Sequence, residues 1–161
     1  MFQLPPSPRA IAAALAALLL CAATLAHADD RPREAVALGR YLVQTAGCND
    51  CHSPGYTQNA GKTPENTWLT GDSLGWQGPW GTTYASNLRL VFAGLTEKQW
   101  LAHARKMESR PPMPWFSLRA MTDGDLKAIY RYIKAAGPAG QPAPAYVPPG
   151  QAVSGPVVRM P

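Results

Sequence analysis

Cysteine is scarce in this chain, which has three cysteines among 161 residues. Cys21 lies inside an apolar N-terminal segment, so Cys48 and Cys51 are the two that remain after it. Two cysteines three positions apart close no long loop, which excludes the disulfide framework of small secreted domains. A zinc site is also disfavoured, because it needs more histidine or cysteine ligands than the chain offers. After residue 28 the sequence adds only His103 to Cys48, Cys51 and His52.

A membrane-length hydrophobic run and a strong charge excess are missing as well. The longest apolar run covers residues 10–25, about 16 residues, whereas a spanning helix needs roughly 20. The formal net charge of +5 is small and evenly distributed, which argues against nucleic acid and favours acidic docking partners. The chain has no internal repeat, and its length suits one ordinary domain.

The N-terminus has the pattern of an export signal. Arg9 precedes the apolar run, and Ala26-His27-Ala28 places small residues where a signal peptidase cleaves. We therefore predict a signal peptide over residues 1–28, cleaved after Ala28, and a periplasmic mature protein. An uncleaved N-terminal anchor is the alternative. Lipid attachment at Cys21 is disfavoured, because that reaction requires a small residue where Leu20 stands.

The strongest chemical motif is Cys48-Asn49-Asp50-Cys51-His52. A C-x-x-C-H motif places two thiols about one helical turn apart, where they can bond to two vinyl groups on one edge of a porphyrin. The next residue, His52, then lies beneath the iron as an axial ligand. The motif predicts one covalent haem c attached through Cys48 and Cys51. A thioredoxin-like redox site is disfavoured because no alternating strand precedes the motif, and a chance match is the remaining alternative.

The second axial ligand has five candidates after residue 28: Met107, Met113, Met121, Met160 and His103. We predict Met113, because Pro112 and Pro114 hold it in a rigid extended segment. Met107 and Met121 are explained by helix packing, Met160 ends the tail, and His103 is expected on a solvated helix face. Thioether ligation favours ferrous iron and raises the reduction potential, which suits an electron carrier.

The alternative function is a haem c enzyme or gas sensor with an open or displaceable sixth iron site. No acid–base pair lies near the haem motif in sequence, so we predict an electron-transfer protein that is not an enzyme and binds no small-molecule substrate.

Helical signals lie on both sides of a long irregular stretch. A first helix is expected from about residue 31 to Ala46, and residues 53–95 show no sustained periodicity. Capping boxes at Thr96 and Thr122 open two later helices, the second of which ends at Gly137-Pro138. We predict a domain over residues 29–138 whose irregular stretch wraps the haem. The Pro-rich tail, 139–161, is expected to be extended or disordered, and docking of a structural subunit through it is a further possibility.

These features together resemble a class I cytochrome c. More narrowly, the segment 78–88, Gly-Pro-Trp-Gly-Thr-Thr-Tyr-Ala-Ser-Asn-Leu, is similar to a loop of the cytochrome domains that serve periplasmic alcohol and sugar dehydrogenases. Met113-Pro114-Trp115 and Met121-Thr122-Asp123 add to that resemblance, which covers roughly residues 34 to 137.

The resemblance implies an all-α cytochrome c fold, with three to four main helices around one haem. It implies that the first and last helices cross at Gly39, which would approach Tyr130 or Ile133. It also implies that a carbonyl near Gly78-Pro79 accepts a hydrogen bond from the His52 ring.

The tryptophans are expected to wall the haem pocket, and Pro79 and Trp80 are candidate pocket residues. Arg89 or Lys62 are candidates to pair with a haem propionate, a solvated surface position being the default for both. Expected partners are a protein electron donor and acceptor, such as a periplasmic dehydrogenase or a terminal oxidase.

Overall fold

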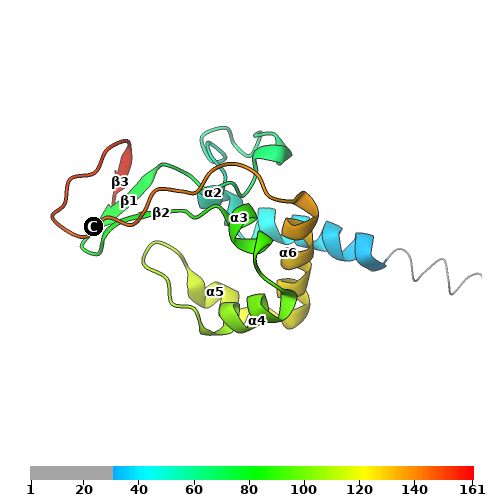
Figure 1. Ribbon diagram of the computed structural model, residues 1–161. Helices are drawn as coiled ribbons and strands as arrows, with labels where there is room; N and C mark the ends of the chain where they lie inside the picture. Colours follow the sequence, from blue (N-terminus) through cyan, green and yellow to red (C-terminus); the bar gives the residue numbers. More distant parts are fainter. Residues whose placement is uncertain (1–30) are drawn as a thin grey trace, which may run out of the picture. The chain divides into compact units, whose positions relative to one another are not determined.

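The computed structural model describes residues 31–161, so Cys21 and the predicted signal peptide lie outside the described residues. Ala35–Pro161 is one compact unit. Residues 31–45 are helical, and the elements that follow are α2 (Cys48–His52), η1 (Glu65–Thr67), β1 (Gly75–Gly78), β2 (Gly81–Tyr84), α3 (Leu88–Ala93), α4 (Glu97–Lys106), α5 (Trp115–Ala120), α6 (Asp123–Ala136) and β3 (Val157–Arg159) (Figure 1). Within the described residues, no helix has both the length and the apolar character to cross a membrane.

Capping chemistry sets the start of the two longest helices after α2. The Thr96 hydroxyl accepts from the Gln99 amide at the start of α4, and the Thr122 hydroxyl accepts from the Asp125 amide at the start of α6. The Gln99 and Asp125 side chains in turn accept from the backbone amides of Thr96 and Thr122, which completes a capping box at each helix. Helix α6 ends at Gly137, whose φ of 69° favours glycine. Both predicted capping boxes and the predicted end of α6 are confirmed.

The first helix crosses α6 at Gly39, as predicted, but its neighbours are different residues. A Cβ at Gly39 would lie 2.0 Å from the Ala128 carbonyl oxygen and 2.7 Å from Tyr132 Cβ. The predicted neighbours Tyr130 and Ile133 are therefore wrong. The missing side chain at Gly39 lets the first helix approach the α6 backbone at Ala128 this closely.

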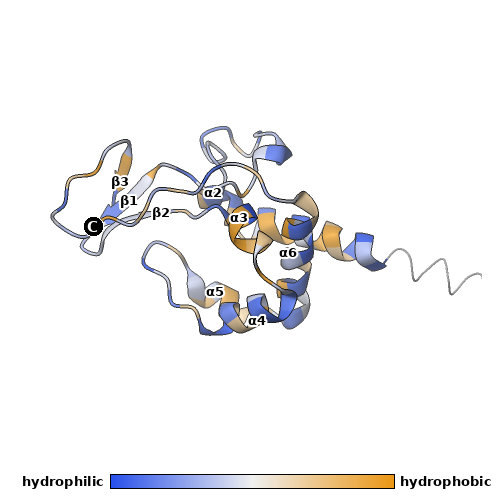
Figure 2. Cartoon of the chain, in the orientation of Figure 1, coloured by the Kyte–Doolittle hydropathy of each residue, from blue (hydrophilic) through white to orange (hydrophobic). Residues whose placement is uncertain are grey.

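The core is built on α6 and the aromatic residues that pack against it. Trp100 of α4 is 6% exposed, and its indole N–H donates to the Leu126 carbonyl at 2.8 Å. Phe92 of α3 packs on Trp100 with ring centroids 4.6 Å apart. Hydrophobic and hydrophilic residues alternate along the ribbon of α6, as expected for a helix with one buried face (Figure 2).

The all-α prediction is wrong in one respect, because the chain also forms a small three-stranded sheet in the order β2-β1-β3. Strands β1 and β2 make an antiparallel hairpin in which Gly78 pairs with Gly81, and β3 pairs in parallel with β1. Each strand has only three or four residues and lacks a clear apolar–polar alternation, so periodicity could not reveal it. The hairpin and α3 lie inside the stretch expected to be irregular, and β3 lies in the tail.

Candidate haem site

The described residues enclose a cavity of about 580 Å³, within the usual range of roughly 300–1,000 Å³ for cofactor sites. Its lining includes Cys48, Cys51 and His52 of α2 together with Met113 from the loop between α4 and α5. Most of the remaining wall is apolar and includes Leu88, Phe92, Trp100, Leu118, Ile129 and Ile133. The fold thus brings a dithiol, an imidazole and a thioether to one apolar cavity.

Helix α2 presents the two cysteines from a single turn. Gly47, the N-cap of α2, adopts the left-handed conformation with a φ of 72°. Cys48 and Cys51 follow one turn apart as free, half-buried thiols. Asn49 is fully buried and accepts at 2.7 Å from the hydroxyl of Ser53, the residue that caps the C-terminus of α2. Burial raises the pKa of Cys48 to about 11 and also raises the pKa of Cys51, so both side chains are protonated thiols at neutral pH.

The His52 ring is oriented by a backbone carbonyl. Its Nδ1 lies 2.8 Å from the Ser86 carbonyl oxygen, and because a carbonyl only accepts, Nδ1 carries the proton. Nε2 is then the nitrogen with a free lone pair. Burial lowers the pKa of His52, which favours the neutral imidazole that coordinates metals. The predicted acceptor near Gly78-Pro79 is wrong, because those residues lie at the hairpin while Ser86 lies between β2 and α3.

Four of the five candidates for the second axial ligand line the cavity. Met113 does so from the loop 107–114, and Met107, Met121 and His103 also contribute to the wall. Met160 instead lies beside the sheet, where its amide donates to the Gln77 carbonyl. The cavity lining therefore excludes Met160 as the second axial ligand but does not distinguish among the other four candidates. The argument for Met113 remains the rigidity of its proline-flanked segment.

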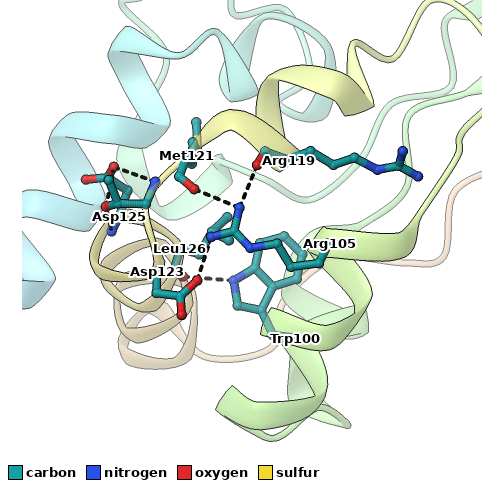
Figure 3. Close-up of polar contacts among 8 residues, drawn as sticks. Trp100, Arg105, Arg119, Met121, Asp123, Asp125 and Leu126 are labelled. Atoms are coloured by element: carbon teal, nitrogen blue, oxygen red, sulfur yellow. Dashed lines mark hydrogen bonds and ion pairs between the residues drawn. The ribbon is translucent and has the colours of Figure 1, made fainter.

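Two arginines tie the C-terminus of α4 to the C-terminus of α5, and Figure 3 shows the contacts of Arg105. Arg105 of α4 donates to the carbonyls of Arg119 and Met121 at 2.6 and 2.8 Å and pairs with Asp123. Arg119 of α5 donates in return to the Met107 carbonyl at 2.9 Å. Each cation satisfies carbonyls at the C-terminus of the other helix, which fixes α5 against α4 on either side of the loop.

Several residues singled out from the sequence lie away from the cavity. Pro79 and Trp80 form the turn between β1 and β2 and are not among its lining residues, whereas Trp76 and Trp100 are. Lys62 is exposed. Arg89 is 7% exposed and donates to the carbonyls of Asn66, Ala136 and Gly137, so the expected solvated position is wrong.

The sequence analysis missed Ser86, whose carbonyl orients His52, and Arg110, whose side chain lines the cavity. Asn87 is the N-cap of α3. Because asparagine is a preferred N-cap residue, it was the signal in the sequence that a helix begins directly after Ser86.

The donor set fits a haem c and not a bare metal ion. Among residues 31–161, no three His, Cys, Asp or Glu side chains gather in a way that would hold an ion. One imidazole and one thioether can instead serve as axial ligands to an iron whose other ligands come from a porphyrin, and two thiols can attach that porphyrin. The apolar wall suits the porphyrin faces.

Comparison with known proteins agrees with this geometry. The family model described as Cytochrome c matches residues 36–137, a range that contains α2, the Met113 loop and α6. Searches of curated proteins and of solved structures found no match. The match spans more than half of the chain and implies a covalently bound haem c and a role in electron transfer. With its haem motif at the wall of an apolar cavity, the chain belongs to the cytochrome c family.

Proposed function

We propose that this protein is a periplasmic electron carrier with a single haem c attached to Cys48 and Cys51 and axially ligated by His52 and Met113. The observation that supports it is the cavity that brings these four side chains together from α2 and from a loop far along the chain. Only one C-x-x-C-H motif occurs in the sequence, which supports a single haem.

The haem supplies a one-electron iron couple, and the surrounding residues set its properties. The Ser86 carbonyl holds the His52 proton on Nδ1, which orients the ring and makes Nε2 a stronger donor. A Met113 thioether favours the ferrous state, and the apolar walls limit water access, both of which raise the reduction potential. With the haem bound, the site would supply one-electron chemistry, so the surrounding residues need form no bond to a substrate.

The ligand assignment is tested by comparing Met113→Ala with Met107→Ala and Met121→Ala in the haem-loaded ferric protein. The control methionines line the same cavity, so all three variants remove one thioether from one environment. We expect the weak long-wavelength absorption band of thioether-ligated ferric haem to disappear in Met113→Ala and to persist in both controls. Loss of the band in a control variant would assign the ligand to that methionine instead. A high-spin spectrum in the parent would overturn the carrier proposal and favour ligand binding at an open iron.

Covalent attachment is tested by mass spectrometry of the denatured protein. The parent should retain one haem, while the Cys48→Ser and Cys51→Ser pair should lose it on denaturation. Retention of haem by the double variant would contradict the attachment proposed here.

Export and the electron donor need separate experiments. N-terminal sequencing of the periplasmic protein should begin at Asp29, whereas recovery of full-length protein in membranes would favour an anchor. As donor we propose a periplasmic alcohol or sugar dehydrogenase, on the resemblance of residues 78–88. Rapid reduction by such an enzyme would support this, and reduction no faster than that of an unrelated ferric cytochrome would refute it.

A further inference from the structure

The C-terminal segment 139–161 lies beyond the range matched by the cytochrome c family model. It nevertheless runs from the end of α6 past α3 to the sheet, where it ends as β3 (Figure 1, orange to red). We call residues 139–161 the strap. A segment outside the family range that makes specific contacts calls for a physical role of its own.

The strap contacts the histidine side of the cavity first. The Asn87 side chain donates to the carbonyls of Ala139 and Gln141, at 2.8 and 3.1 Å. Asn87 is 3% exposed, and its oxygen accepts from the Leu90 amide, so the side chain is held at both ends. Asn87 directly follows Ser86, the residue whose carbonyl orients His52.

The strap then reaches the methionine side. The Arg110 guanidinium lies 3.7 Å from the centroid of the Tyr146 ring, a cation–π contact. Arg110 lines the cavity, and its carbonyl accepts from the Met113 amide at 3.3 Å. Tyr146 thus touches the turn that carries Met113.

Tyr146 is itself held firmly in place. Its hydroxyl donates to the Trp80 carbonyl at 2.8 Å. The next residue, Val147, exchanges two backbone hydrogen bonds with Thr82 of β2, at 2.8 and 3.0 Å. Further along, β3 pairs with β1. The aromatic face that Arg110 meets is therefore anchored through the sheet.

We propose that the strap positions the Met113 loop, with Tyr146 as the positioning residue that acts through Arg110. Arg119 fixes the start of that loop at the Met107 carbonyl, and Arg105 fixes the far end of α5. The middle of the loop contacts the strap through the cation–π pair of Arg110 and Tyr146. Without Tyr146 the Arg110 turn loses this contact, and the loop opens more often. The consequence for the iron rests on the proposed ligation by Met113, whereas the mechanical role does not.

The test compares Tyr146→Ala with Tyr146→Phe in the haem-loaded protein. The Phe variant keeps the ring face under Arg110 and loses only the hydroxyl bond to Trp80. The first measurement is amide hydrogen exchange, which reports loop opening without using electron transfer. We expect exchange of the amides in 107–114 to speed up about three- to fivefold in Tyr146→Ala, the size of one partly exposed cation–π contact. Exchange in α4 and α6 should stay unchanged, and Phe should remain near the parent.

The second measurement is the affinity of the ferric protein for imidazole, which competes with the sixth ligand. Tyr146→Ala should bind imidazole more tightly by the same factor, because the loop opens more readily. Arg110→Ala should match it, and the double variant should add nothing further, as expected for one shared contact.

Unchanged exchange of 107–114 in Tyr146→Ala overturns the proposal, as does full additivity of the two alanine variants. Faster exchange with unchanged imidazole affinity supports the strap and counts instead against Met113 as the displaced ligand.

Discussion

Replacing Gly39 with alanine tests the helix crossing on which the fold depends. The new methyl carbon would lie 2.0 Å from the Ala128 carbonyl oxygen and 2.7 Å from Tyr132 Cβ. Both are below the shortest separation that such carbons tolerate, and the first neighbour is α6 backbone, so no side chain can rotate away. The two helices must move apart.

The expected magnitude follows from two opposing effects. Overpacking typically costs 1–3 kcal/mol of stability. We use the upper value, about 3 kcal/mol, because the new methyl group clashes with backbone atoms that cannot rotate away. Alanine in a helix interior gains about 1 kcal/mol over glycine. The net loss in the free energy of unfolding is about 2 kcal/mol. For a chain of this size that lowers Tm by roughly 6 °C.

The matched control is Gly124→Ala in the first turn of α6. A Cβ there would meet its nearest neighbour, the Thr122 hydroxyl oxygen, at an ordinary 3.5 Å. This variant should therefore gain about 0.5–1 kcal/mol from helix propensity alone. Urea unfolding followed by far-ultraviolet circular dichroism, on protein with equal haem content, measures both. Equal stabilisation by the two alanines would refute the close crossing.

The remaining predictions concern a buried phenol and a helix cap. Tyr132 donates to the Glu65 carboxylate at 2.9 Å, so Tyr132→Phe should lose roughly 1 kcal/mol at pH 7, measured by urea unfolding. Burial, reinforced by Glu65, raises the pKa of Tyr132, while Arg40 and Arg89 oppose this shift. The phenol therefore contributes its full stability below its unfolded pKa of about 10 and loses it as pH rises further. The difference between parent and variant should narrow above pH 10, and a widening difference would contradict this assignment. Thr122→Ala should cost about 1 kcal/mol by removing the cap of α6, and an unchanged urea midpoint would show that the cap contributes nothing.

Local signals explain what was predictable in the fold. A capping box is a contact between residues three apart, so Thr96 and Thr122 marked the starts of α4 and α6 without any tertiary information. Glycine inside an amphipathic helix marked a close crossing at Gly39, but not which side of α6 it meets. The short strands gave no signal, because their pairing joins the hairpin to a tail residue such as Val158, far along the chain.

The haem site divides in the same way. The attachment motif is local, since two thiols and an imidazole within one helical turn suffice to specify the chemistry of Cys48, Cys51 and His52. The carbonyl that accepts from His52 belongs to Ser86 and not to a residue near Pro79. This depends on the path of the chain after β2, which is a tertiary property. Arg110 and Tyr146 are far apart in the sequence but in contact in the fold. No local sequence pattern around either residue predicts this contact.

By itself, the sequence determined the cofactor chemistry and the ends of the main helices, because these depend on residues within one or two turns of each other. Only the tertiary structure decided which methionines reach the cavity, which carbonyl orients His52, and how the strap returns to the Met113 loop. Those outcomes are set by packing and by hydrogen bonds between distant segments, which no local spacing encodes.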